Sequence, residues 1–137
     1  MTEKNLPMSQ DEAVSLVKRF LQRMEERDLA TAEVMMAPNA TITFPGSKSY
    51  ATQGEMVAAS KGRYLWVKKS IDLVDCLSEE PGHIVYIMGT LYGVNRHGIP
   101  FQDIRFIDRF EIIDSAITRQ DVWNDLAESG VLDASNR

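Results

Sequence analysis

The segment that decides the fold runs from Ile104 to Ile113 and reads Ile-Arg-Phe-Ile-Asp-Arg-Phe-Glu-Ile-Ile. In a β-strand, successive side chains point to opposite faces of the sheet. One face of this strand is therefore an apolar row with a carboxylate at its centre: Ile104, Phe106, Asp108, Phe110 and Ile112. A register shifted by one residue would bury Arg105 and Arg109 instead, so the apolar row is predicted to face the core.

Asp108 is the exception in this row, because a carboxylate on a core-facing surface is costly unless it is paired, hydrogen-bonded or protonated. Two interpretations remain open. Either the row lines a cavity in which Asp108 has a raised pKa and a chemical role, or Asp108 is a core polar group satisfied by Gln120, Asn124 or a water. Gln120 and Asn124 have the same parity in the following strand, and we expect them to face the same cavity.

The composition predicts one globular domain, since the chain has 137 residues of which 44% are hydrophobic and 26% charged. A net charge of −5 and the lack of a basic stripe argue against binding to nucleic acid or to an anionic membrane. No apolar run is long enough to span a membrane. Cys76 is the single cysteine and cannot form an internal disulfide, so a reducing cytoplasm is expected. The thiol itself is interpreted as buried and inert. No set of residues has metal-ligand spacing and no glycine-rich phosphate loop is present, so neither metal nor cofactor is expected.

Three helices are predicted. Ser9 and Glu12 form a capping box, and the apolar stripe that follows it at helical spacing predicts an amphipathic helix over about 10–27. A second, shorter helix is expected to start at Asp28, to include Met36 and to end at Pro38. A third is expected from Thr52 to about Tyr64.

The strands are predicted mainly in the second half of the chain. A short hairpin is expected over 40–44 and 48–51, followed by a four-strand antiparallel meander over 64–77, 83–94, 104–113 and 117–123. This segregation of helices and strands predicts an α+β fold: a cone-shaped, curved antiparallel β-sheet wrapped around the long N-terminal helix. Strand 83–94 is apolar on both faces, and its outer residues Tyr86, Met88 and Tyr92 predict a homodimer formed through the sheet.

Three groups of motifs resemble the nuclear transport factor two-like superfamily, in particular its SnoaL-like branch. They are Arg-Asp-Leu-Ala at 27–30, Ala-Pro-Asn-Ala-Thr at 37–41, and the C-terminal segments 106–111, 117–119 and 122–125. The resemblance implies a single SnoaL-like (cystatin-like) α+β barrel domain at 9–128. A flexible N-terminus at 1–8 and a C-terminal tail at 129–137 are expected on either side of it. The superfamily includes ketosteroid isomerases, dehydratases, polyketide cyclases, epoxide hydrolases and non-catalytic binding modules, so the fold does not decide the activity.

The resemblance to ketosteroid isomerases implies a role for Asp108, which falls where that family has its oxyanion-hole aspartate. The family's tyrosine falls on Phe20 and its aspartate base on Phe44. Phenylalanine can neither donate a hydrogen bond nor accept a proton, so the familiar isomerase mechanism is not available. In the cyclase and epoxide hydrolase patterns, the aspartate of the last strand falls on Val122 and the cyclase histidine falls on Gln120.

Two functions are therefore open. The first is a cofactor-free isomerase, dehydratase or cyclase acting on a small, hydrophobic, cyclic substrate, with Asp108 as the acid, base or oxyanion group. The second is a non-catalytic module that binds a small ligand or a partner protein. In either case the expected ligand-binding residues, most of them aromatic, are Phe20, Phe44, Tyr64, Phe106, Phe110, Gln120, Val122 and Asn124.

Overall fold

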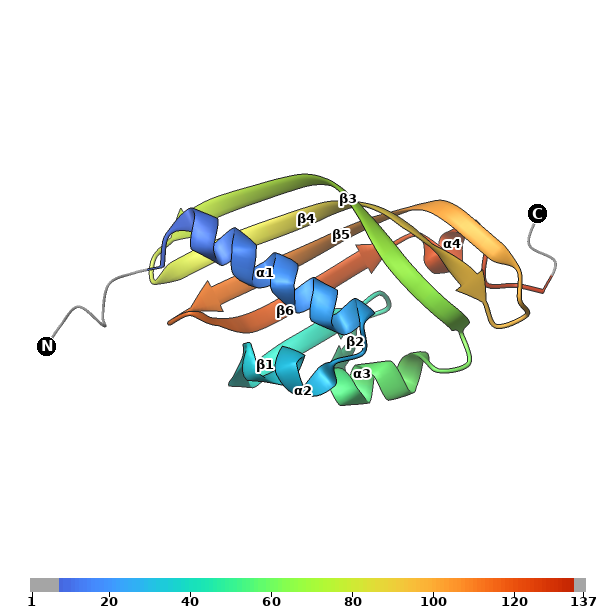
Figure 1. Ribbon diagram of the computed structural model, residues 1–137, viewed down its shortest axis with the longest axis horizontal. Coiled ribbons are helices and arrows are strands. Elements are labelled where there is room, and N and C mark those ends of the chain that lie inside the picture. The colour runs from blue at the N-terminus through green and yellow to red at the C-terminus, as the bar shows by residue number, and fades with distance from the viewer. Residues whose placement is uncertain (1–7, 135–137) are drawn as a thin grey trace, which may run out of the picture.

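The computed structural model describes residues 8–134, so the predicted flexible segment before Met8 and the last three residues of the predicted tail lie outside the described residues. Helices and strands alternate in the first half of this part of the chain, and strands dominate the second half (Figure 1). The elements are α1 (Gln10–Glu25), α2 (Leu29–Val34), β1 (Met36–Phe44), β2 (Lys48–Tyr50), α3 (Gln53–Ser60), β3 (Tyr64–Glu79), β4 (Gly82–Asn95), β5 (Pro100–Ile113), β6 (Ala116–Asn124) and α4 (Leu126–Ser129).

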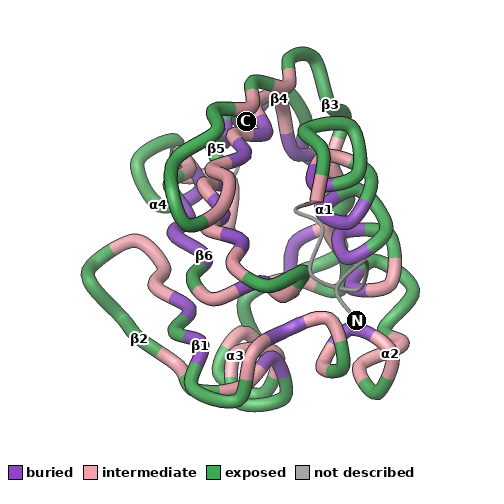
Figure 2. Tube along the Cα trace, turned by 90° about the vertical axis from the view of Figure 1, so that its left-hand side faces the viewer, coloured by how far each residue is buried: buried purple, intermediate pink, exposed green. Residues whose placement is uncertain are grey.

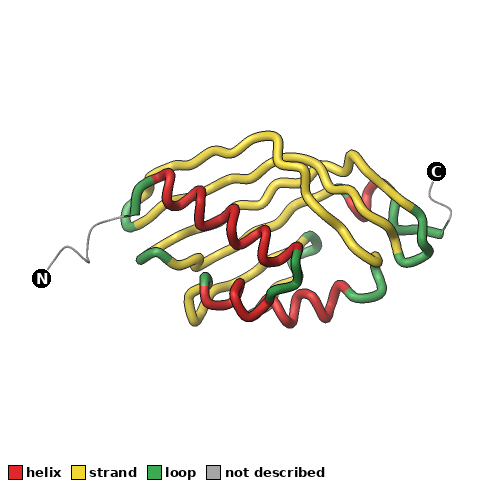
Figure 3. Tube along the Cα trace, in the orientation of Figure 1, coloured by secondary structure: helices red, strands yellow, loops and turns green. Residues whose placement is uncertain are grey.

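The strands form one six-stranded sheet in the order β2-β1-β6-β5-β4-β3. The sheet is curved but not closed, and α1 lies along its concave face (Figure 3). Neighbouring strands are antiparallel except for β1 and β6, which are parallel. The predicted α+β fold, with a curved sheet around a long N-terminal helix, is confirmed. The single parallel pair joins the predicted hairpin to the edge of the predicted meander.

Helix α1 begins at the predicted capping box, in which the Glu12 amide donates to Ser9 Oγ over 3.1 Å and the Ser9 amide donates to Glu12 Oε1 over 2.8 Å. Its apolar stripe is buried against β3 and β4. Figure 2 shows the buried stretches of α1 opposite those of the strands, across the interior of the molecule. Beside this interface, the ring of Phe20 packs edge to face on that of Phe110 in β5, with the ring centroids 5.8 Å apart.

Two predicted boundaries are corrected. Helix α2 ends at Val34, and both Met36 and Pro38 belong to β1, which is longer than the predicted strand. Pro38 is tolerated there because it lies in an irregular part of the β1–β6 pairing, where a residue without an amide hydrogen loses no ladder bond. Helix α3 ends at Ser60 instead of Tyr64, because Gly62 adopts a left-handed conformation with φ 88° and Tyr64 begins β3.

Strand β3 contains a bulge that determines which of its side chains face the interior. The pairing with β4 passes from Ile71–Gly89 to Leu73–Met88, which leaves Asp72 as an extra residue. Between an earlier register shift at 64–66 and this bulge, odd-numbered residues such as Lys69 point inward, whereas Val74 points inward after the bulge. Gly89 is required opposite the bulge, because a Cβ atom there would lie 1.9 Å from the carbonyl oxygen of Ser70.

Strand β5 contains the segment that decided the fold, and its predicted register is confirmed. The apolar row is buried along its whole length: Ile104, Phe106, Asp108, Phe110 and Ile112. The row faces α1 and the interior of the curved sheet. The fold therefore places one carboxylate, Asp108, in the middle of an otherwise apolar strand face.

Candidate functional site

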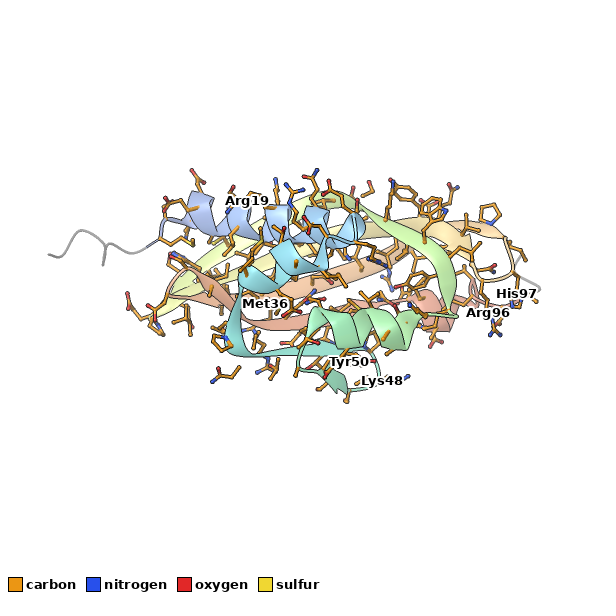
Figure 4. All side chains as sticks on the ribbon, turned by 60° about the horizontal axis from the view of Figure 1, so that its bottom comes forward. Arg19, Met36, Lys48, Tyr50, Arg96 and His97 are labelled. Carbon is orange, nitrogen blue, oxygen red and sulfur yellow. The ribbon has the colours of Figure 1, made fainter. Side chains whose placement is uncertain are left out.

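A cavity of about 360 Å³ lies between the inner face of the sheet and helices α1 and α3. Its walls are mostly apolar and are contributed by both helices and by all six strands of the sheet: Leu21, Met24, Phe44, Met56, Val67, Leu91, Phe106 and Val122 are examples. Tyr50 and Lys48 also line it, and Figure 4 shows both on β2, beside α3. A space of this size accommodates a small ring compound.

Asp108 lines this cavity and has no exposed surface. Its cross-strand neighbours are Ile87 and Val122, both apolar. Among the described residues, neither oxygen of its carboxylate has a hydrogen-bond partner. Burial raises the pKa of Asp108 above its ordinary value, and the positive charge of Lys69 opposes this effect. Asp108 is therefore a carboxylate whose hydrogen-bonding capacity is unused and which faces an apolar cavity.

Lys69 is the nearest charged group to Asp108, with Nζ 3.6 Å from Oδ2. Its ammonium also lies 5.3 Å from the centre of the Phe106 ring, and its backbone amide donates to Glu25 Oε2 over 2.9 Å. The next lysine in the sequence, Lys68, points away from the cavity and lies over the ring of Trp66. Lys69 was not predicted as a site residue, because the bulge at Asp72 reverses the alternation of β3. The imperfect alternation of segment 64–77 was the only signal of it.

A second polar group in the cavity consists of Gln53 and Gln120. Gln53 is fully buried at the start of α3, and its Nε2 donates to Gln120 Oε1 over 3.0 Å. Its backbone amide donates to Glu33 Oε2 over 2.7 Å, which fixes the start of the helix. The remaining atom, Gln53 Oε1, is buried and has no hydrogen-bond partner among the described residues. Gln53 was also missed, because a polar residue next to the Thr52 cap is expected at the surface of a helix start.

The structure brings together most of the predicted site residues. Six of them line the cavity with Asp108: Phe44, Tyr64, Phe106, Gln120, Val122 and Asn124. Phe20 and Phe110 are a correction, because they are fully buried between α1 and β5 and do not line the cavity. Neither predicted amide contacts Asp108 either, since Gln120 accepts from Gln53 and Asn124 Oδ1 accepts from the Leu126 amide.

The other candidate residues lie away from the cavity. His83 contacts the Met8 carbonyl oxygen and Ser78, whereas His97 is exposed in the turn after β4, where Figure 4 shows it beside Arg96. Burial raises the pKa of the Cys76 thiol, and this side chain packs against the core. Within residues 8–134, no three His, Cys, Asp or Glu side chains are grouped so that they could hold a metal ion. None of the described helices is long and apolar enough to cross a membrane.

No family model and no curated protein matches the sequence. The fold, however, is similar to many solved structures. A protein of unknown function from Burkholderia pseudomallei, described as NTF2-like, has a TM-score of 0.73 and 17% identity over 93% of this chain and 100% of its own. TerC, co-crystallized with polyporic acid, has a TM-score of 0.72 and 14% identity over 87% of this chain and 95% of its own. An LEH-like epoxide hydrolase from M. tuberculosis has a TM-score of 0.65 and 18% identity over 85% of each chain. At such identities, the similarity establishes the fold and leaves the activity open.

Proposed function

We propose that this chain, which has the nuclear transport factor two-like fold that its motifs implied, is a cofactor-free enzyme acting on a small, hydrophobic, cyclic substrate. The observation that carries the proposal is Asp108: a fully buried carboxylate, without a hydrogen-bond partner among the described residues, that lines an apolar cavity beside Lys69. Solved structures with this fold include a putative polyketide cyclase and a putative isomerase, which supports this class of reaction.

The proposed chemistry is proton transfer next to a ring ketone. Asp108 removes a proton from the carbon beside the carbonyl, and the electron pair of that C–H bond forms the C=C bond of an enolate. The enolate oxygen accepts a hydrogen bond from the Lys69 ammonium, which stabilises the negative charge where it develops. Where the ring ketone carries a double bond between its β- and γ-carbons, the enolate is conjugated, and return of the proton from Asp108 to the γ-carbon completes an isomerisation. Loss of a neighbouring hydroxyl group, which takes the same proton and leaves as water, completes a dehydration.

The environment of Asp108 suits a general base. Because burial raises its pKa, Asp108 binds a proton more strongly than an exposed aspartate does, and a general base works best when its pKa is near the working pH. The opposing positive charge of Lys69 keeps the ionised form accessible. Gln53 Oε1 and Gln120 provide a second polar point at which a hydroxyl group of the substrate is oriented.

Deuterium exchange tests this proposal without knowledge of the natural substrate. The protein is incubated in D₂O with cyclohexanone and other small cyclic ketones, and NMR spectroscopy follows deuterium incorporation beside the carbonyl. We expect exchange above the buffer rate, reduced at least about a hundredfold by Asp108→Asn, which is the usual contribution of a general base. Asp121→Asn is the matched control, since Asp121 is almost equally buried but lies on the outer face of the sheet. Exchange at the buffer rate, or equal exchange in both variants, contradicts the proposal.

A second candidate function is ligand binding without turnover. Phe44 favours it, because this apolar side chain lines the cavity at the position where the resemblance implies a catalytic base. A thermal-shift series of small planar phenols separates the two functions. Stabilisation by phenols that is unchanged in Asp108→Asn, together with the absence of deuterium exchange, supports binding alone. Stabilisation that changes in Asp108→Asn supports a direct role of the carboxylate.

We also propose that two copies of the chain associate through the outer face of the sheet. An apolar row crosses four strands on this face, since Leu73 pairs with Met88, Met88 with Ile107, and Ile107 with Trp123. Leu73, Ile107 and Trp123 have exposed fractions of 52%, 38% and 53%. Contiguous exposed apolar surface of this kind is typical of an interaction site.

A further inference from the structure

The charged residues that line the cavity are mostly basic, although the protein as a whole is acidic. Arg27, Lys48, Arg63 and Lys69 line it, against Glu25 and Asp108 as the acidic residues. The whole chain has 15 Lys and Arg and 20 Asp and Glu. Lys69 faces Asp108 over 3.6 Å, so these two charges offset each other. The other three basic residues then outnumber the one remaining acidic residue, Glu25.

These three residues, Arg27, Lys48 and Arg63, are exposed, and we refer to them as the entrance cations. They come from three separate segments: the end of α1, the start of β2 and the loop between α3 and β3. Figure 1 shows these segments around the same part of the molecule. Within the described part of the chain, none of the three forms an ion pair, whereas Arg23, Arg105, Arg109 and Arg119 all pair with carboxylates.

Arg27 is held in place by the backbone of α1. It has φ 60°, and its Nη1 donates to the carbonyl oxygen of Met24 over 2.6 Å, near the C-terminal end of the helix. A guanidinium has five N–H donors, so the Met24 contact leaves others available. A side chain that is already fixed loses less conformational entropy when it binds a ligand. Arg27 is therefore a preorganised donor beside the cavity, and Lys48 and Arg63 add positive charge around it.

We propose that the entrance cations select a ligand that carries a carboxylate, so that the substrate class is a small cyclic carboxylic acid. The ring lies against the apolar walls near Phe44 and Phe106, and the carboxylate lies at the entrance, where a guanidinium can bind both of its oxygens. The positive entrance also attracts such an anion to a protein of net charge −5. This proposal rests on the proposed function, since it takes the same cavity as the substrate site.

The test compares benzoate with benzamide, which have nearly the same shape and differ in charge. Isothermal titration calorimetry or ligand-observed NMR measures both dissociation constants. We expect benzoate to bind about tenfold tighter at low ionic strength, because up to three exposed ion pairs each contribute a modest amount. The difference should shrink with added salt, since the Debye length falls from about 30 Å at 0.01 M to about 3 Å at 1 M. The affinity for benzamide should change little.

The double variant Arg27→Gln with Arg63→Gln removes both guanidinium groups at the entrance, so it should lose most of the preference for benzoate and keep the affinity for benzamide. Lys61→Gln is the matched control, because Lys61 is an exposed cation two residues before Arg63 that does not line the cavity. Benzoate that binds no better than benzamide, or a double variant that keeps the preference, overturns the proposal. Asp108→Asn should retain the preference while losing ketone exchange, so the entrance and the proposed reaction can fail independently.

Discussion

Two adjacent rows of side chains cross strands β3, β4, β5 and β6 on opposite faces of the sheet. The inner row consists of Val74, Ile87, Asp108 and Val122, and the outer row of Leu73, Met88, Ile107 and Trp123. The inner row buries a carboxylate among apolar groups, whereas the outer row exposes apolar groups to solvent. Each row departs from the usual division of a half-buried sheet into an apolar inside and a polar outside. Such departures are expected at sites that bind something.

The two departures have different physical costs. In the inner row, the cost is the loss of hydration of Asp108, which no hydrogen bond among the described residues replaces. In the outer row, the cost is apolar surface left in water, at roughly 25 cal/mol per Å². A small molecule that hydrogen-bonds Asp108 would relieve the first, and a second copy of the chain would relieve the second.

The largest effect is expected for Gly89→Ala, which disrupts the bulge that sets the inward and outward residues of β3. The new Cβ atom would lie 1.9 Å from the Ser70 carbonyl oxygen, so the paired strands must separate. We expect the free energy of unfolding to fall by about 3 kcal/mol, the upper end for overpacking, as measured by urea denaturation. Gly54→Ala is the matched control, since its Cβ atom meets nothing closer than Thr52 Oγ1 at 3.8 Å. A Gly89→Ala variant as stable as the wild type would show that the bulge is not required.

The bulge also explains which parts of the site could be predicted from the sequence. The alternation of 104–113 is strict, so it predicts the inner face of β5 and identifies Asp108 as its exception. The same parity argument fails in β3, because one extra residue at Asp72 moves Lys69 to the inner face. The imperfect alternation of 64–77 indicates an irregular strand, but the position of the extra residue follows only from the pairing with Gly89. The position of Lys69 beside Asp108 therefore depends on how β3 pairs with β4, and it could not be predicted from the sequence of β3 alone.

Tertiary packing limited the prediction in two other places. Phe20 and Phe110 were expected in the cavity wall because both lie on inward faces, but their rings pack edge to face against each other and are fully buried. Gln53 was not predicted as a buried residue, since its burial depends on contacts with β1 and β6 that are distant in the sequence. The periodicity of the sequence predicts which side chains point inward. Whether such a side chain fills the core or lines the cavity depends on how closely the helices and strands pack, which the periodicity does not show.

The next largest effect is expected in the outer row, where Ile107→Glu places a charge at its centre. If this row is the interface between two copies, we expect the dimer dissociation constant to rise at least about a hundredfold, which corresponds to about 2.7 kcal/mol. Sedimentation equilibrium measures this change. Gln102→Glu is the control, because it introduces the same side chain at an exposed position of β5 outside the row. A wild-type protein that stays monomeric at high concentration, or an unchanged dissociation constant in the variant, removes the interface.

The smallest effect, and the one that separates function from stability most directly, is expected for Asp108→Asn. The variant loses no hydrogen bond to a described residue, and it removes the cost of burying a charge, while Lys69 loses its neighbour. We expect it to be about 1 kcal/mol more stable than the wild type at neutral pH, because burial of the ionised carboxylate without a hydrogen-bond partner among the described residues costs free energy. Asp121→Asn, on the outer face, breaks ion pairs with Arg119 and Arg109 and should lower stability by about 1 kcal/mol.

The stability difference between Asp108→Asn and the wild type should depend on pH, in a direction that the raised pKa of Asp108 determines. Because folding raises the pKa of Asp108, its contribution to stability is complete below the ordinary carboxyl pKa and is lost as the pH rises through the value in the folded state. The advantage of Asp108→Asn should therefore be absent at acid pH, grow through the range above 3.8, the ordinary value, and then level off. Urea denaturation at a series of pH values measures it. A variant less stable than the wild type at neutral pH would mean that the attraction of Lys69 outweighs the burial, and Asp108 would then be a structural residue. If Asp108 instead lowers the free energy of unfolding where it is ionised, it does not stabilise the fold, and its role is in the binding or chemistry of the cavity.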